Sequence, residues 1–299
     1  MRWGSVVFAG LIAAWIAGTP ALGQYVEPTM FERTGVFASR RVSESSGVAV
    51  SRRHPGVLWT HNDSGDDPFI YITDLNGRDG GAFRLDGAVA HDWEDMSLGP
   101  CPGRAGDCLY VADTGDNSLD RREVWIYIVP EPEPGSAAGG VRGDVHQLRV
   151  RYPDGAHDVE GMAVTPGGEI FLVTKGRQGH VVLFCIPPRE AHTDRVLAAL
   201  IDTLPIVPQR NLGRLVTGAS ISPSGRRLVV RTYTELYFFD RGPDGRFRPQ
   251  GPPCWLGVRE PQGEAVDFLD EDTLVLTSEG GFGQPGMIAR VKCPGPPGS

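Results

Sequence analysis

Short apolar runs alternate with polar turns along most of the chain. Typical runs are Val57 to His61 and Val181 to Ile186, and typical turns between them are His54-Pro55-Gly56 and Asn76-Gly77. Brief runs rich in β-branched and aromatic residues, bounded by Gly, Pro and Asn, predict β-strands joined by tight turns. The chain also contains 40 Gly and 25 Pro, which suits many such turns. The pattern therefore predicts an all-β protein.

One motif recurs at the start of successive groups of predicted strands. Its two clearest copies are His91-Asp92-Trp93-Glu94-Asp95-Met96 and His157-Asp158-Val159-Glu160-Gly161-Met162. In all five copies one residue precedes a short apolar run, and these residues are Gly47, Asp95, Gly161, Gly218 and Gly263. Irregular intervals of roughly 50 residues, each opening with a strand, are typical of propeller blades. We predict a five-bladed β-propeller, with six blades as the alternative if the segment between Gly161 and Gly218 holds a further sheet.

The predicted last blade ends one strand short at the C-terminus. Residues 35–42 have the pattern of a strand and precede the first repeat. A strand from this segment would complete the last blade and remove an exposed sheet edge. In the third blade we expect the fourth strand near Ile201 to Ile206, with a short helix within residues 189–202 as the alternative.

The first 23 residues have the features of a secretory signal peptide. Arg2 gives a positive start, Val6 to Ala17 an apolar core, and Ala21-Leu22-Gly23 a small-residue cleavage site. We therefore expect a signal peptide at 1–23, a single β-propeller domain at 24–299, and a secreted or periplasmic protein without membrane contact after cleavage. An uncleaved N-terminal anchor is the alternative.

Five cysteines remain after the predicted cleavage site. Cys101 and Cys108 flank a short turn between two predicted strands, and we predict a disulfide between them. Cys254 lies before the last blade and Cys293 at its end, so a second disulfide would fasten the C-terminus. Cys185 is predicted to be a free strand residue. Five reduced cysteines are the alternative in a reducing compartment.

The net charge of −8 argues against nucleic acid and anionic membrane surfaces as partners and favours cations or basic ligands. We expect a monomer that binds a small molecule, a glycan or a protein.

Many acidic residues are predicted to meet at one end of the propeller axis. The first strand of each blade lines the axis, and alternate residues of a strand share a face. We term the end at which these first strands begin the mouth. One row around the axis is predicted to contain Ser46, Glu94, Glu160, Thr217 and Gln262, with Glu264 one step deeper; the next row, nearer the mouth, contains Glu44, Asp92, Asp158, Leu215 and Glu260.

Crowded carboxylates repel one another unless a cation, a shared proton or water relieves the repulsion. An all-oxygen ligand set suits Ca²⁺ better than zinc or copper. The predicted metal ligands are Asp92, Glu94, Asp158, Glu160 and Glu264. Candidate catalytic groups are Asp92, Glu94, Asp158 and Glu160, together with His91 and His157; candidate ligand contacts are Lys175, Arg231, Asp63, Asp113 and Glu279. In the alternative interpretation, these carboxylates only cap turns and strands.

Several motifs resemble a group of uncharacterised bacterial secreted β-propeller proteins. These motifs are Asp92-Trp93-Glu94-Asp95, Ala112-Asp113-Thr114-Gly115-Asp116-Asn117, Asp158-Val159-Glu160, Thr174-Lys175 and Gln262-Gly263-Glu264-Ala265. The resemblance covers nearly all of the mature chain and implies the propeller fold without an activity. A more distant resemblance, to phytase-like esterase and calcium-dependent phytase propellers, implies Ca²⁺ and a phosphorylated substrate. The mouth departs from that pattern because Lys175 and Arg231 are its main cations.

Three functions are compatible with this pattern. The first is metal-dependent hydrolysis of a small ester or phosphoester, in which an ion activates water and one carboxylate acts as the base. The second is a non-catalytic propeller that binds a ligand or a protein, because the fold alone does not define an activity. The third is glycoside hydrolysis by a pair of carboxylates. The sequence does not decide whether the protein is an enzyme.

Overall fold

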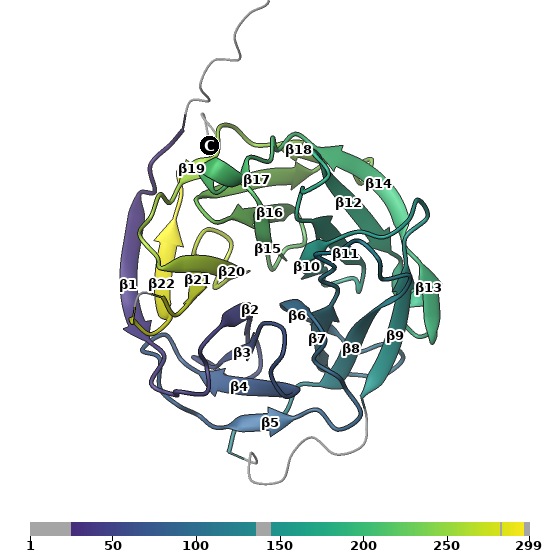
Figure 1. Cartoon of the computed structure of the whole chain (residues 1–299), viewed down its shortest axis with the longest axis horizontal. Coiled ribbons are helices and arrows are strands. Elements are labelled where there is room, and N and C mark those ends of the chain that lie inside the picture. The colour runs from purple at the N-terminus through teal and green to yellow at the C-terminus, as the bar shows by residue number, and fades with distance from the viewer. Residues whose placement is uncertain (1–24, 136–144, 282, 296–299) are drawn as a thin grey trace, which may run out of the picture.

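Five sheets are arranged around a central axis (Figure 1). The computed structural model describes residues 25–135, 145–281 and 283–295. The chain is an all-β, five-bladed propeller, as predicted, and the described residues contain no sixth sheet. The predicted signal peptide at 1–23 lies outside the described residues, so this boundary stays a prediction.

Each blade runs outward from the axis in chain order. Blade one comprises β2 (Ser45–Val50), β3 (Leu58–Asn62), β4 (Phe69–Thr73) and β5 (Ala82–Arg84). Blade two comprises β6 (Trp93–Pro100), β7 (Asp107–Asp113), β8 (Val124–Pro130) and β9 (His146–Arg151), with β13 (Arg195–Leu197) added parallel to β9. Blade three comprises β10 (Val159–Val164), β11 (Ile170–Thr174), β12 (Val181–Ile186) and β14 (Ala199–Leu204).

The other two blades depart slightly from this plan. Blade four comprises β15 (Val216–Ile221), β16 (Arg227–Thr232), β17 (Glu235–Arg241) and β18 (Phe247–Pro249), with β19 (Cys254–Trp255) also paired to β17. Blade five comprises β20 (Gln262–Phe268), β21 (Leu274–Glu279), β22 (Met287–Lys292) and the N-terminal β1 (Met30–Val36). The innermost strands β2, β6, β10, β15 and β20 surround the axis (Figure 1).

An N-terminal strand closes the ring, as predicted, but its position along the chain differs. Strand β1 pairs antiparallel with β22, so the first and last strands lie side by side (Figure 1). The predicted range 35–42 was wrong, because most of it forms the connection to blade one. Phe37 and Val42 are buried in the core beneath this connection. The apolar residues of this connection are therefore buried in the same way as the residues of a strand, and their sequence pattern looks like that of a strand.

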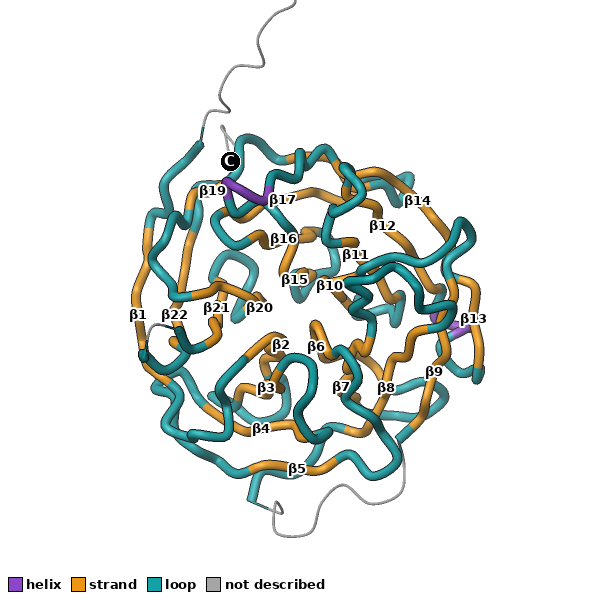
Figure 2. The backbone as a smooth tube through the Cα atoms, viewed as in Figure 1, coloured by secondary structure: helices purple, strands orange, loops and turns teal. Residues whose placement is uncertain are grey.

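The segment between β12 and β14 contains only a short 3-10 helix, η2 (Pro188–Glu190), and then β13. A second 3-10 helix, η3 (Arg210–Leu212), precedes β15, and the rest of the described chain consists of strands and loops (Figure 2). Val196 of β13 is buried against blade two and belongs to the hydrophobic core that blades two and three share. The fourth strand of blade three ends at Leu204, slightly before the predicted end.

Both predicted disulfides are present. Cys101–Cys108 closes the turn between β6 and β7, and Cys254–Cys293 joins β19 of blade four to the end of β22. Closing the short loop contributes roughly 2–3 kcal/mol on the chain-entropy model. Cys185 is free, as predicted. Within the part of the chain that the structure describes, no helix is long and apolar enough to cross a bilayer.

Candidate functional site

All five innermost strands bulge at the same level of the axis. The pairing register of each with its neighbour slips by one residue, so that one residue is left unpaired. The residues at these slips are Ser46, Glu94, Glu160, Thr217 and Glu264. A bulge bends its strand and redirects a side chain. The row predicted around the axis is thus correct in four blades, whereas in blade five its member is Glu264 instead of Gln262.

The polar members of this row have two different roles. The Ser46 hydroxyl donates to the Glu94 carbonyl at 2.6 Å, and the Thr217 hydroxyl donates to the Glu264 carbonyl at 2.8 Å. These hydroxyls join neighbouring blades. The carboxylates of Glu94, Glu160 and Glu264 are almost completely buried at the same level. They bring negative charge to the axis.

Two groups of three carboxylates meet at the mouth and share Glu94. The first group is Asp63, Asp92 and Glu94, and the second is Glu94, Asp158 and Glu160. Within each group, one oxygen per residue lies within 4.8 Å of the others. Asp63 follows β3, and Asp92 and Asp158 precede β6 and β10, so three loops and two bulges build the cluster. The structure therefore brings together four of the five predicted metal ligands.

The second group already contains cationic side chains. Lys175 forms an ion pair with Glu160, and Arg177 Nε lies 3.0 Å from Asp158 Oδ2. Asp158 Oδ1 also accepts the backbone N–H of Asp116 at 2.9 Å. Lys175 was a predicted ligand contact, whereas Arg177 was not recognised in the sequence, although it lies only two residues further along the same loop. The second group is therefore largely neutralised.

The first group has no such cation. Among the described residues, no hydrogen bond or ion pair reaches the carboxylates of Asp92 or Glu94, and Glu94 is only 5% exposed. Burial, followed by the charge of Glu160, raises the pKa of Glu94 well above its ordinary value. Burial and the charges of Asp63 and Asp158 raise the pKa of Asp92 to about 6. The charge of Lys175 opposes the rise for Glu94 and that of Arg121 the rise for Asp92, so nearby cations relieve the repulsion within the first group only in part.

A glycine lies directly against this first group. A Cβ atom on Gly115 would lie 2.1 Å from Glu94 Oε1 and 2.5 Å from Asp92 Oδ2. The Gly115 N–H donates to the Asp92 carbonyl at 3.2 Å, and the Gly115 carbonyl accepts from Arg121 Nη1 at 2.6 Å. The segment from Asp113 to Arg121 is thus held with its backbone against the carboxylates. Any side chain at position 115 would displace them.

The two predicted catalytic histidines differ in position. His157 is buried in blade three, where Nε2 contacts Asp154 Oδ1 at 2.9 Å and the ring meets Tyr152 and Phe184 edge-on. His91 is exposed and lines a groove beside the mouth. The structure therefore does not bring His157 into the carboxylate cluster, although it directly precedes Asp158.

Arg231, a predicted ligand contact, is fully buried beneath blade five. Its guanidinium donates to the carbonyls of Ala265 and Thr277 and pairs with Glu260 at 2.5 Å. With these partners Arg231 fastens blade four to blade five. It lies beneath a glycine, since a Cβ atom on Gly263 would meet its Nη2 at 1.9 Å.

The remaining predicted contacts lie around the cluster. Asp113 accepts the Asp92 N–H at 3.1 Å and pairs with Arg121 at 2.8 Å, so it supports the mouth through the backbone. Glu264 accepts from Gln262 at 2.9 Å, and burial raises its pKa well above its ordinary value. Burial and the charges of Asp63 and Glu44 raise the pKa of Glu279 to about 7.

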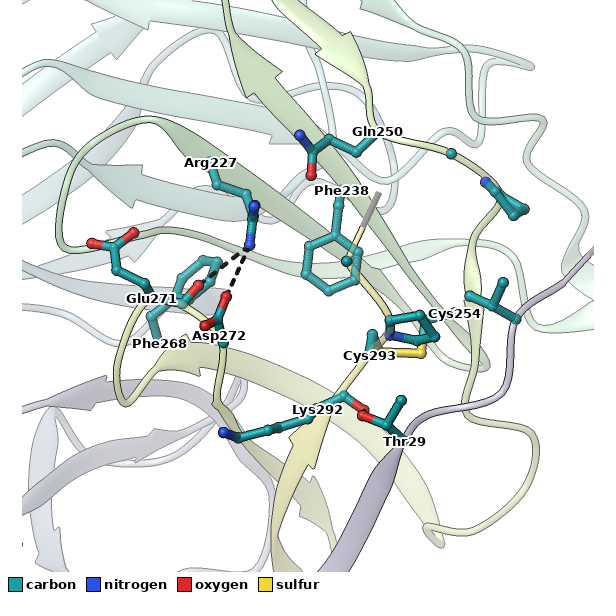
Figure 3. A pocket seen from close by; sticks show the side chains of 15 residues that line it. Thr29, Arg227, Phe238, Gln250, Cys254, Phe268, Glu271, Asp272, Lys292 and Cys293 are labelled. Atoms are coloured by element: carbon teal, nitrogen blue, oxygen red, sulfur yellow. Dashed lines mark hydrogen bonds and ion pairs between the residues drawn. A yellow bond between two sulfur atoms is a disulfide. The ribbon is translucent and has the colours of Figure 1, made fainter. Parts of the chain in front are cut away.

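A separate cavity of about 430 Å³ lies at the outer edge of blades four and five (Figure 3). Phe238, Arg227, Asp272 and the Cys254–Cys293 disulfide line it (Figure 3). Arg227 lies 3.4 Å from Asp272 and 3.6 Å from Asp240. The charge of Arg227 is thus paired at the rim, and the cavity contains none of the predicted metal, catalytic or ligand residues.

Comparisons with known proteins concern the fold. No protein-family model and no curated protein matches the chain. The PQQ-bound form of aldose sugar dehydrogenase from Streptomyces coelicolor has a similar structure, with a TM-score of 0.49 and 12% identity over 92% of this chain and 99% of that chain. A crystal structure of a nidogen/laminin complex gives 0.47 and 13%, over 83% and 84%. Both likenesses are distant, and the PQQ is a property of the first protein.

Proposed function

We propose that Asp63, Asp92 and Glu94 bind a divalent cation, with Ca²⁺ as the first candidate, and that the mouth hydrolyses a small phosphoester beside it. The observation that carries this proposal is the Glu94 carboxylate, which belongs to both acidic groups and has no partner among the described residues while only 5% exposed. An unpaired buried carboxylate is costly unless a cation or a proton compensates it.

The first group fits the cation better than the second. Lys175 and Arg177 already compensate Glu160 and Asp158. The first group offers only carboxylate oxygens, which are the ligands that Ca²⁺ and Mg²⁺ prefer. The lack of a side chain at Gly115 leaves room for the carboxylates to converge. The chemistry of the donors and the space around them therefore favour the same three residues.

Hydrolysis would divide the charged groups of the mouth into two roles. A divalent cation supplies polarisation of the phosphoryl group and lowers the pKa of water. The ion pair with Glu160 keeps Lys175 protonated. The Lys175 ammonium can then donate a proton to the leaving oxygen, and the Asp92 carboxylate can accept one from the attacking water.

We also propose that the protein works outside the cytoplasm, as a secreted or periplasmic protein. Two disulfides support this location, since such bonds persist in oxidising compartments. The signal-peptide pattern of the first 23 residues agrees with it.

Calorimetric titration with CaCl₂ tests the cation site. We expect the wild type to bind Ca²⁺ and Glu94→Gln to bind at least about tenfold more weakly, which corresponds to about 1.4 kcal/mol. The matched control is Glu32→Gln, because Glu32 is an exposed acid on outer strand β1 that pairs with Arg290. Equal affinities of Glu94→Gln and wild type, or no binding by either, would reject the site.

Hydrolysis is tested separately with p-nitrophenyl phosphate and bis(p-nitrophenyl) phosphate. We expect Ca²⁺-dependent turnover that Lys175→Met abolishes while Ca²⁺ binding is retained. The second candidate function is a Ca²⁺-dependent propeller that binds without catalysis. It is favoured by the use of Lys175 and Arg177 in ion pairs, which leaves few free cations for a phosphate. Tight Ca²⁺ binding without turnover of either ester would support this second function.

A further inference from the structure

A groove of about 500 Å³ lies between blades one and two, beside the mouth. One wall comes from the connection between β5 and β6, with Val89 and His91, and the other from Trp125 and Tyr127 of β8. Trp125 and Tyr127 are two residues apart on one strand, so they face the groove from the same side of the sheet. No residue of the groove belongs to the first acidic group.

Hydrogen bonds fix the wall formed by the connection. Gln147 Nε2 donates to the Gly87 carbonyl at 2.7 Å, and the Val89 N–H donates to the Tyr127 hydroxyl at 3.2 Å. The indole N–H of Trp93 donates to the Val89 carbonyl at 2.9 Å. The backbone of Val89 is thus held on both sides, while its side chain is 63% exposed. These hydrogen bonds hold this wall of the groove in place without help from a ligand.

The charges in the groove are paired. Arg121 forms an ion pair with Asp113 at 2.8 Å, and Glu123 forms one with Arg195 at 3.2 Å. The Arg121 guanidinium also lies 5.7 Å from the centre of the Trp125 ring. The groove therefore has no excess of either charge, whereas the neighbouring mouth is strongly acidic. A neutral polar molecule fits this surface better than an anion or a cation.

We propose that this groove binds a neutral sugar ring. The C–H face of a pyranose is apolar and packs by dispersion against an aromatic or aliphatic surface, here Trp125 and Val89. Its hydroxyl groups need hydrogen-bond partners when water is excluded. His91, Glu123 and Gln147 supply donors and acceptors at the edge of that apolar surface. An apolar pocket with a few polar groups is the usual form of a small-molecule site.

The groove and the acidic group share one chain segment. Asp113 and Arg121 line the groove, and Gly115 between them lies against Glu94 and Asp92. A sugar bound beside Trp125 would therefore lie next to the proposed cation site. The proposal does not depend on that cation, because every contact it uses lies in the groove.

Saturation-transfer NMR and calorimetry test the proposal with a panel of neutral trisaccharides: maltotriose, cellotriose, xylotriose, mannotriose and chitotriose. We expect at least one to bind with a dissociation constant of about 1 mM or tighter. Trp125→Leu removes the apolar face, and Val89→Trp fills the groove from an exposed position. Each should weaken binding at least about tenfold.

The matched control is Trp255→Leu, because Trp255 packs against Tyr25 at the edge of blade four and does not line the groove. This variant should bind as the wild type does. If Trp125→Leu does not fold, the affinity of Val89→Trp decides the test, because this substitution leaves the backbone hydrogen bonds of residue 89 unchanged. Absence of binding by the whole panel, or wild-type affinity of Val89→Trp, would overturn the proposal. Preferential binding of 2-naphthol would overturn it too, because the groove would then select aromatic rings.

Discussion

Two sets of buried carboxylates lie on the same axis in opposite surroundings. At the mouth, the Glu94 carboxylate accepts no hydrogen bond and forms no ion pair within the part of the chain that the structure describes. One residue further along the chain, Asp95 is fully buried and accepts the backbone N–H groups of Met96, Met162 and Ala219 at 2.8, 2.8 and 3.0 Å. These two adjacent acidic residues therefore differ in the hydrogen-bond donors that the fold supplies to their carboxylates.

A second acid repeats the arrangement of Asp95. Asp267 of β20 accepts the backbone N–H of Val50 at 2.7 Å and the hydroxyl of Ser220 at 2.5 Å. Asp95 joins β6 to β10 and β15, and Asp267 joins β20 to β2 and β15. Together these two side chains contact all five innermost strands. They join innermost strands that belong to separate sheets.

We interpret this difference as one between structural acids and candidate functional acids. Burial raises the pKa of Asp95 above its ordinary value, and three backbone donors oppose that rise. The fold thus gives Asp95 partners that need nothing from outside the protein. Glu94 receives none, so its compensation must come from a ligand, a cation or a proton. Hydrogen bonds within the fold thus account for the Asp95 carboxylate, whereas they leave the Glu94 carboxylate without a donor.

The largest expected effect is that of Asp95→Asn. Whichever way the amide is oriented, its NH₂ group faces at least one of the three backbone N–H donors, which is left without an acceptor. An unsatisfied buried donor costs about 1–3 kcal/mol, so we expect the free energy of unfolding to fall by roughly 2–4 kcal/mol. Urea denaturation measures this loss. A change below about 0.5 kcal/mol would show that Asp95 does not hold the blades together.

Much of the fold was predictable because its signals are local. Turn residues, apolar runs and the repeated motif indicated five blades, and the short Cys101–Cys108 spacing indicated a disulfide. The start of β1 was missed because Phe37 and Val42, in the connection to blade one, are buried like strand residues. The roles of Asp95 and Asp267 were not predictable, since their partners lie far away in the sequence.

The site was predictable in composition but less so in geometry. Asp92, Glu94, Asp158 and Glu160 do meet, since matching positions in successive blades converge at the axis. The repeat was aligned on Gly263, but the residue that follows the bulge in blade five is Ala265, which is why Gln262 was placed where Glu264 lies. His157 lies outside the cluster because its side chain packs against Tyr152 and Phe184 in the core of blade three.

The second prediction concerns Glu94→Gln, which keeps the shape of the side chain and removes its charge. Without metal we expect stability to be unchanged or higher by up to about 1 kcal/mol, because repulsion with Glu160 is relieved. In the wild type, Ca²⁺ at one hundred times its dissociation constant should add about 2.7 kcal/mol, and the variant should lack this gain. Thermal melting in Ca²⁺ and in chelator measures both. Destabilisation like that of Asp95→Asn would place Glu94 among the structural acids.

The third prediction uses pH. The pKa of Glu279 is raised from 4.5 to about 7, so between these values the folded state retains a proton that the unfolded state has lost. This group therefore stabilises the fold at acidic pH, and its contribution disappears as the pH rises towards 7. In chelator we expect Glu279→Gln to reduce the fall in stability over this range. Parallel curves for the variant and the wild type would contradict the shift.

The smallest expected effect on stability, and the sharpest test of the mouth, is Gly115→Ala. The new Cβ atom would collide with the oxygens of Glu94 and Asp92, which are the ends of flexible side chains and can move away. Replacing Gly by Ala also restricts the unfolded chain, which gains about 0.4–1 kcal/mol, so the net change in stability should stay within about 1 kcal/mol. Displacing two of the three proposed ligands should weaken Ca²⁺ binding at least about tenfold.

Gly167→Ala is the matched control, because its Cβ atom would meet only Thr165 Oγ1 at 3.5 Å. Loss of Ca²⁺ affinity in Gly115→Ala alone, with both variants folded, would assign the cation to the unpartnered acids. Equal affinities would show that the position of these carboxylates does not matter for the cation, and the comparison between Glu94 and Asp95 would then concern stability only.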